Sequence, residues 1–118
     1  TKGKGLFSWH QDFAFFPHTN TSLVAVMVML DDAKPENGCM QIVRGSHKWG
    51  LLDHMIGGKF TGACQEPDRW SDQRLIANVT PKTGGISIHH CLSLHGSDPN
   101  LSGKPRRGLV FTPPLVRC

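Results

Sequence analysis

Turn-forming residues interrupt this chain at short intervals, and they restrict it to short strands joined by tight turns. Its 118 residues include 13 glycines and 8 prolines. The longest uninterrupted apolar run, Leu23–Leu30, is closed at once by Asp31 and Asp32. A run of this length suits a buried strand and is far shorter than the roughly 20 apolar residues of a membrane-spanning helix. The sequence therefore predicts an all-β fold that does not cross a membrane.

Five segments have the apolar or aromatic content of strands, and each ends at a turn signal. They are Leu6–Phe16, Leu23–Leu30, Cys39–Val43, Ile86–Leu94 and Arg107–Thr112. The turn at Pro35–Gly38 predicts a hairpin between the second and third segments, and the second should be covered on both faces. Between Trp49 and Asn78 the pattern is irregular, with helical character over Asp68–Ala77, which indicates an insertion. Many short strands with little helix favour a β-sandwich or a jelly-roll barrel.

The length corresponds to one domain, residues 1–118. The first residues, Thr1-Lys2-Gly3-Lys4-Gly5, include no methionine and precede no apolar segment. We expect the chain to begin inside a longer one.

The charge pattern argues against nucleic acid as a partner. The formal net charge is +4, but the basic residues are scattered among acids, apart from the cluster Lys104–Arg107. No basic stripe interleaved with aromatic residues is present. A small anionic ligand near the cluster is the better expectation.

The cysteines leave two alternatives for the compartment. The four of them (Cys39, Cys64, Cys91 and Cys118) are widely spaced and form no C-x-x-C pair, so a structural zinc site is not expected. Free thiols in a reducing cytoplasm are the preferred interpretation. Two disulfides in a secreted β-domain remain the alternative.

The motif Trp9-His10-Gln11-Asp12 is the sharpest chemical feature. In an extended strand, residues two apart project to the same side, so His10 and Asp12 can reach one metal ion while Gln11 points away or binds separately. One imidazole and one carboxylate are two of the three ligands of the facial triad that holds non-haem Fe(II). A surface strand with a capping aspartate would explain the same two residues.

A third ligand has to come from another segment, where three histidines are candidates. Alternation along Ile86–Leu94 puts His89 on the same side as His95, among small residues. His90 lies on the opposite side with Ile86 and Ile88, which predicts a buried structural histidine. The spacing itself does not decide between His89 and His95.

Two adjacent arginines follow at the start of the last expected strand. Arg106 and Arg107 must face opposite sides of that strand, so only one can point inward. Arg106 shares its side with Val110, and its guanidinium could bind a carboxylate through two hydrogen bonds.

Taken together, these segments resemble the phytanoyl-CoA dioxygenase family. The resemblance rests on Trp9-His10-Gln11-Asp12, Glu36-Asn37-Gly38-Cys39, Val43-Arg44-Gly45-Ser46-His47-Lys48, and His89 to Ser97 followed by Asn100 and Arg106, in the family's order over nearly the whole chain. It implies a double-stranded β-helix, a cupin-like barrel, that binds Fe(II) and 2-oxoglutarate, activates O2 and hydroxylates a small molecule with release of succinate and CO2. It also implies that the N-terminal part of the family fold is missing.

The resemblance assigns individual roles as well. The metal ligands and catalytic residues fall on His10, Asp12 and His95, which decides between His89 and His95. Arg106 matches the arginine that binds the far carboxylate of 2-oxoglutarate, with Ser97 as a second contact and Gln11 as a third position near the co-substrate. A non-catalytic jelly-roll module that binds a metal or another ligand is the alternative function.

Overall fold

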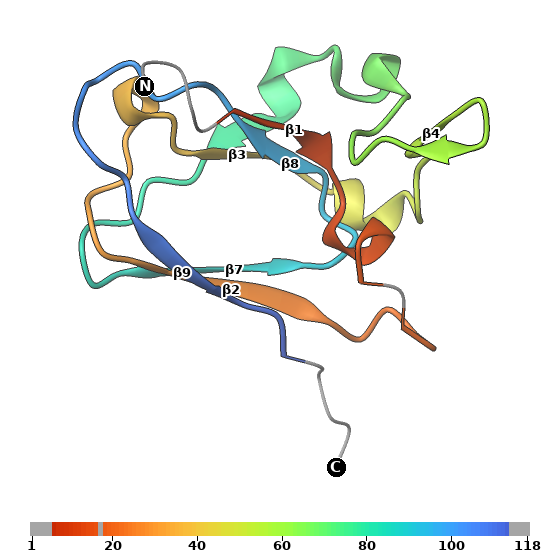
Figure 1. The fold of residues 1–118 in the computed structure, drawn as a ribbon, viewed down its shortest axis with the longest axis horizontal. Coiled ribbons are helices and arrows are strands. Elements are labelled where there is room, and N and C mark those ends of the chain that lie inside the picture. Colours follow the sequence, from red (N-terminus) through yellow and green to blue (C-terminus); the bar gives the residue numbers. More distant parts are fainter. Residues whose placement is uncertain (1–5, 17, 114–118) are drawn as a thin grey trace.

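Two antiparallel sheets face each other in the computed structural model, which describes residues 6–16 and 18–113 (Figure 1). The strands are β1 (Phe7–His10), β2 (Val24–Met29), β3 (Met40–Val43), β4 (Met55–Ile56), β5 (Lys59–Phe60), β6 (Ile76–Asn78), β7 (Ile86–His90), β8 (His95–Ser97) and β9 (Gly108–Phe111). Short 3-10 helices supply the described helical residues: η1 (Asp12–Ala14), η2 (Pro35–Asn37), η3 (Ser46–Lys48), η4 (Pro67–Trp70) and η5 (Gln73–Leu75). The strand-rich architecture confirms the predicted fold class.

The strands pair in an order that departs from their order along the chain. One sheet runs β1-β8-β3-β6 and the other β7-β2-β9, while β4 and β5 form a separate hairpin. The expected hairpin between Leu23–Leu30 and Cys39–Val43 is therefore wrong, because β3 pairs with β6 and β8 instead of β2. The turn at Pro35–Gly38 carries the chain from one sheet to the other.

Strand β2 has one buried face and one half-exposed face. Ala25, Met27 and Met29 are buried between the sheets, whereas the valines that alternate with them are only half-buried. The prediction that this run is covered on both faces is wrong for the described residues. Its inner side chains form a core cluster with Cys39 and Met40 of the opposite layer.

The segment Ile86–Leu94 is one strand followed by a turn. Strand β7 ends at His90, and the Ser93 amide donates to the His90 carbonyl at 2.8 Å before β8 begins in the other sheet. The side chains of Ile86 and Ile88 lie on the outer face of the sheet and are more than half exposed. His90 shares that face and is half-buried while His89 is buried, so the expectation of a buried His90 is wrong.

The region 49–78 is irregular, as expected, but its regular parts are 3-10 turns and short strands. Helical character over Asp68–Ala77 is limited to η4 and η5, and Ile76 already begins β6. The β4–β5 hairpin projects beside the two sheets (Figure 1).

Three of the four cysteines lie in the described part of the chain. Cys39, Cys64 and Cys91 are buried free thiols there, and Cys118 lies outside the described residues. The alternative of a secreted domain with two disulfides would use all four cysteines. Three of them are free thiols, which contradicts that alternative. Among residues 6–16 and 18–113, no helix has the length and apolar character needed to cross a membrane.

Candidate metal centre

Two neighbouring strands and the turn that follows one of them bring His10, Asp12 and His95 together. His10 is the last residue of β1 and lies directly opposite His95, the first residue of β8. Asp12 does not continue β1, as the two-residue spacing predicted, but is the first residue of η1. Its side chain nevertheless returns to the same point, and one ligand atom from each of the three residues lies within 4.8 Å of the others.

Backbone carbonyls orient both imidazoles in the same way. Nδ1 of His10 lies 2.7 Å from the Ser8 carbonyl oxygen, and Nδ1 of His95 lies 2.9 Å from the Ser93 carbonyl oxygen. A carbonyl oxygen only accepts hydrogen bonds, so each Nδ1 carries the hydrogen. In the neutral rings, Nε2 then offers a lone pair, which is the form in which histidine binds a metal.

The three ligand atoms fit a cation. Nε2 of His10 lies 3.6 Å and Nε2 of His95 lies 3.5 Å from the same carboxylate oxygen, Oδ1 of Asp12. With both rings neutral, three acceptors face one another without a hydrogen between them, an arrangement that a metal ion would relieve. Two imidazoles and one carboxylate are the donor set of a 2-His-1-carboxylate iron site.

The surroundings set the protonation states that this donor set needs. For Asp12, burial would raise the pKa, but the neighbouring imidazoles of His10, His89 and His95 outweigh it and hold the pKa well below its usual range. For His95, burial first and the charges of His10 and His89 next lower the pKa to about 4. At neutral pH the carboxylate is therefore ionised and His95 is neutral, as metal ligation requires.

A further histidine joins the cluster from the opposite sheet. Nε2 of His89, on β7, lies 3.1 Å from Oδ2 of Asp12, the carboxylate oxygen that faces neither His10 nor His95. His89 was one of two candidates for the third ligand. Both candidates contact Asp12, but the ligand group contains only His95.

Beside the cluster lies a cavity of about 230 Å³ between the two sheets. Its lining combines the three predicted ligands with residues of both sheets: Phe7, His10, Asp12, Met27, Met40, His89, His95, Gly96, Ser97, Arg106 and Val110. Arg106 and Val110 share this lining, as expected from strand alternation. Nε of Arg106 donates to the Asn37 carbonyl oxygen at 3.2 Å, which ties the guanidinium to the η2 turn.

Arg107 points to the other side of the strand. Its guanidinium pairs with Asp31, with 2.9 Å between Nε and Oδ2, and the arginine side chain is largely exposed. The adjacent arginines thus separate into one that lines the cavity and one that forms a surface ion pair.

Gln11 does not line the cavity, in contrast to its predicted place near the co-substrate. Its buried side chain donates to the carbonyls of Gly50 and Leu92 and accepts from the Leu52 amide, each at 2.8 Å. All of these partners are backbone groups, so the side-chain amide holds loop segments against the turn that contains Asp12.

His54, in the irregular region 49–78, makes a further hydrogen bond to the same turn. Its Nε2 accepts a hydrogen bond from the backbone N–H of Gln11 at 3.1 Å, and its Nδ1 donates to the Leu52 carbonyl oxygen at 2.9 Å. The backbone between the two ligands of the H-x-D motif is therefore fixed by a residue 43 positions away. Sequence reasoning had no signal for this contact, because nothing local pairs His54 with Gln11.

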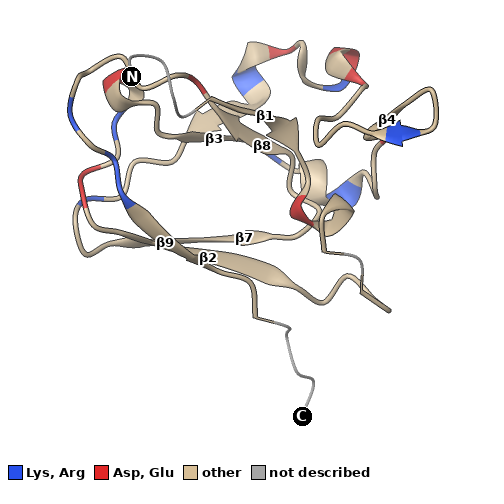
Figure 2. Cartoon of the chain, viewed as in Figure 1, with Lys and Arg blue, Asp and Glu red and all other residues tan. Residues whose placement is uncertain are grey.

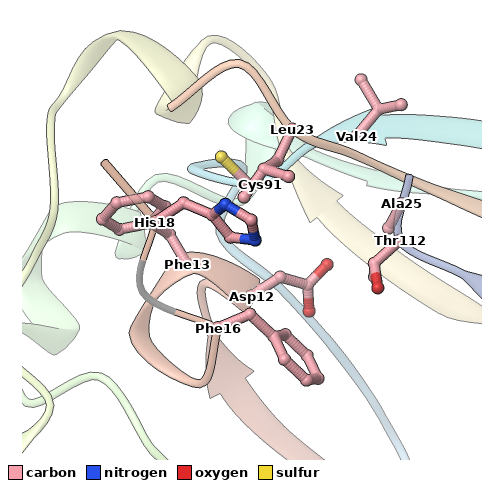
Figure 3. A pocket seen from close by; sticks show the side chains of 9 residues that line it. All are labelled: Asp12, Phe13, Phe16, His18, Leu23, Val24, Ala25, Cys91 and Thr112. Atoms are coloured by element: carbon pink, nitrogen blue, oxygen red, sulfur yellow. The ribbon is translucent and has the colours of Figure 1, made fainter. Parts of the chain in front are cut away.

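Asp12 also borders a smaller, mainly apolar cavity of about 70 Å³. Figure 3 shows the side chains that line it, which include Phe13, Phe16, His18 and Cys91. Asp12 thus lines both this cavity and the one that contains Arg106.

Charges are scattered over the loops, and the strands of the β7-β2-β9 sheet contain no charged residue (Figure 2).

Comparison with known proteins identifies a matching family and several relatives. The sequence model of the phytanoyl-CoA dioxygenase (PhyH) family matches residues 1–108. A probable alpha-ketoglutarate-dependent hypophosphite dioxygenase of Stutzerimonas stutzeri is 38% identical over 107 residues, which is 87% of this chain and 37% of that protein. The chain therefore spans little more than a third of the length of this curated relative.

Solved structures with the same fold are non-haem enzymes. The apo form of ThoJ, a non-heme monooxygenase, superposes with a TM-score of 0.74 at 27% sequence identity. The superposition covers 94% of this chain and 40% of the ThoJ chain. The epimerase SnoN, in complex with Fe3+, alpha ketoglutarate and nogalamycin RO, gives a TM-score of 0.73 at 26% identity and covers 93% of this chain and 42% of its own. These similarities confirm the double-stranded β-helix.

Proposed function

The chain belongs to the phytanoyl-CoA dioxygenase family, and on this premise we propose that it is the core of an Fe(II)- and 2-oxoglutarate-dependent dioxygenase that hydroxylates a small molecule. Bound iron would supply the activation of O2, coupled to decarboxylation of 2-oxoglutarate to succinate. The observation that carries the proposal is the convergence of His10, Asp12 and His95 beside a cavity that also contains an arginine.

Each residue of this chain has a defined task in the proposal. His10 and His95 offer Nε2, and Asp12 offers Oδ1, as the ligands of Fe(II). These three ligands leave coordination positions open for a chelating keto acid and for O2.

Arg106 is proposed to bind the far carboxylate of 2-oxoglutarate. Its side chain lines the same cavity as the ligand group, and its Nε is held by the Asn37 carbonyl oxygen. A guanidinium that is anchored through Nε keeps its terminal nitrogens for a carboxylate. Ser97, buried in the same lining, is proposed as a second contact.

The primary substrate is proposed to be a small molecule that approaches Asp12 from the side away from Arg106. The small cavity of Figure 3 and an open groove with Phe7, Phe15 and Phe16 both include Asp12 in their linings, and neither lining includes Arg106. Aromatic side chains offer apolar faces to such a substrate.

We also propose a cytoplasmic location, because the described cysteines are free thiols.

An anaerobic titration tests the proposed function. Fe(II) and then 2-oxoglutarate are added to the purified protein, and the visible charge-transfer band of a chelated keto acid is recorded. We expect the band in the parent protein and its loss in His95→Ala, with His90→Ala, on the outer face of β7, as the control. A folded, iron-loaded parent without the band would favour the non-catalytic metal-binding module.

The same titration separates the two arginines. Charge-assisted hydrogen bonds contribute about 1.5–3 kcal/mol, so Arg106→Ala should weaken 2-oxoglutarate binding about 10- to 100-fold. Arg107→Ala removes a surface ion pair and should leave the binding unchanged. Equal effects of the two substitutions would remove Arg106 from the proposed site.

A further inference from the structure

The two carboxylate oxygens of Asp12 have different partners. Oδ1 faces Nε2 of both proposed histidine ligands, at 3.5 and 3.6 Å. Oδ2 faces Nε2 of His89, at 3.1 Å. His89 belongs to β7, in the sheet opposite β1 and β8, so the carboxylate lies between two sheets that each contact one of its oxygens.

His89 is the donor in this contact. Nε2 of His89 lies 3.1 Å from Oδ2, and a carboxylate that binds a metal ion is ionised and can only accept a hydrogen bond. Nε2 of His89 therefore carries the hydrogen, and in the neutral ring Nδ1 is left as an acceptor. Nδ1 of His89 is buried and has no hydrogen-bond partner among the described residues.

That unpartnered nitrogen argues against a packing role for the ring. Leaving a buried acceptor unsatisfied costs about 1–3 kcal/mol, a cost that phenylalanine or leucine at this position would avoid. A packing explanation does not account for an imidazole here. The contact with Asp12 does, because only a donor can restrain Oδ2.

His89 is also not a ligand in this geometry. The group of atoms that lie within 4.8 Å of one another contains His10, Asp12 and His95. His89 reaches the oxygen on the other side of the carboxylate. It can therefore act on the metal through the hydrogen bond to Asp12 or through its ring contact with His95, whose ring centroid lies 4.4 Å away.

We propose that His89 is a positioning residue that holds Oδ2 of Asp12 by an Nε2–H hydrogen bond, so that Asp12 presents Oδ1 alone to the metal. This inference rests on the proposed function. A carboxylate that was free to turn could bind the metal through both oxygens and occupy a position that the keto acid needs. His89 thereby preserves the open positions of the site.

Substitutions of His89 that differ in side-chain length and in hydrogen-bond donors separate the effect of the N–H group from the effect of side-chain size. In His89→Gln, the side-chain amide can place an N–H near the position of Nε2. In His89→Phe the ring remains without a donor, and in His89→Asn the donor is too short to reach Asp12. His90→Gln is the matched control, because His90 is the next residue of β7 on the opposite face.

The readout is binding of Co(II), an O2-stable probe, to the purified protein, with thermal unfolding of each metal-free variant as the folding control. Loss of a group that orients a metal ligand typically weakens metal binding 10- to 100-fold. We expect that loss in His89→Phe and His89→Asn, and affinities within about threefold of the parent in His89→Gln and His90→Gln. The 2-oxoglutarate band of the Fe(II) form should fall in the same order.

Two outcomes would overturn the positioning role. One is parent-like Co(II) affinity in a folded His89→Phe or His89→Asn. The other is a loss in His89→Gln as large as in His89→Phe, which would mean that the ring and not its N–H matters. If either His89→Phe or His89→Asn does not fold, the other still decides.

The proposed function fails separately from this inference. A parent that binds Co(II) with the expected variant order, but whose Fe(II) form shows no keto-acid band, would retain the role of His89 and overturn the dioxygenase. A folded parent that binds no Co(II) would overturn both.

Discussion

We expect the side-chain amide of Gln11 to contribute to stability. Its three hydrogen bonds all go to backbone groups, at Gly50, Leu52 and Leu92. Gln11→Ala leaves these buried groups unpaired, at about 1–3 kcal/mol each. We expect a loss of roughly 3–5 kcal/mol in the free energy of unfolding, allowing for partial relaxation, measured by urea denaturation.

Gln41 provides the control for this substitution. Its side chain makes one hydrogen bond to Asn78, at 3.3 Å, near the surface. Gln41→Ala should therefore change the free energy of unfolding by no more than about 0.5 kcal/mol. Similar losses of unfolding free energy for Gln11→Ala and Gln41→Ala would contradict the stabilising role of the three Gln11 hydrogen bonds.

The chemical identity of the site could be predicted from single residues, but their surroundings could not. The donor types of His10 and Asp12 follow from the motif, and the resemblance supplies His95. The contacts of His89 with Asp12 and of His54 with Gln11 span 77 and 43 positions. Such pairs depend on how segments far apart in the sequence meet in the fold, which no local pattern encodes.

At the scale of elements, the turn that precedes β3 depends on Gly38. Its φ of +71° lies in the left-handed region, and a Cβ there would lie 2.5 Å from the Asp98 carbonyl oxygen. Gly38→Ala therefore combines backbone strain, about 1–2 kcal/mol, with a clash that adds roughly 1–3 kcal/mol. We expect thermal unfolding to reveal the sum.

Gly58 is the matched control. It has a φ of +76° in the β4–β5 turn, and a Cβ there would meet nothing within 4 Å. Gly58→Ala should show the strain alone, about 1–2 kcal/mol. If Gly38→Ala is no worse than Gly58→Ala, the close approach of the η2 turn to the loop at Asp98 is wrong.

The extents of the strands could be predicted, whereas their partners could not. β2 falls within the predicted Leu23–Leu30 and β3 within Cys39–Val43, because apolar content and turn residues are local signals. Their predicted pairing failed, since both strands take partners from distant segments. The turn inside Ile86–Leu94 was also missed, because residues 91–94 are buried and apolar or small like those of a strand.

The end of β2 and the start of β9 are joined by an ion pair that makes stability depend on pH. Hydrogen bonds from the Arg107 side chain and amide lower the pKa of Asp31 from 3.8 to about 2. A carboxyl with a depressed folded-state pKa stabilises the fold above its unfolded-state pKa and loses this contribution as pH falls through the folded-state value. The contribution should be complete above about pH 4 and disappear towards pH 2.

Asp31→Asn tests this window. The variant should unfold at a lower temperature than the parent at pH 6, and the difference should shrink as the pH falls from 4 to 2. Because the pair is at the surface, about 1 M salt should also reduce the difference. A difference that is constant over this pH range would assign the effect to the side-chain change and not to the charge.

At the scale of the whole molecule, the outer face of the β7-β2-β9 sheet exposes large apolar side chains. Ile86, Ile88, Leu109 and Phe111 each expose half or more of their surface there. None of the three strands carries a charge (Figure 2), and β7 and β9 are edge strands among the described residues. Contiguous apolar surface next to unpaired strand edges promotes association.

The 118-residue chain should therefore self-associate through this face when it is expressed alone. In the double variant Ile86→Thr and Ile88→Thr, β-branching is kept while apolar surface is removed, so the sheet should persist. We expect sedimentation velocity to show a larger monomer fraction at equal concentration than for the parent. Leu101→Thr is the control, because Leu101 is 80% exposed in a loop away from the sheet. An equal gain from Leu101→Thr would mean that general surface polarity, and not this sheet face, governs association.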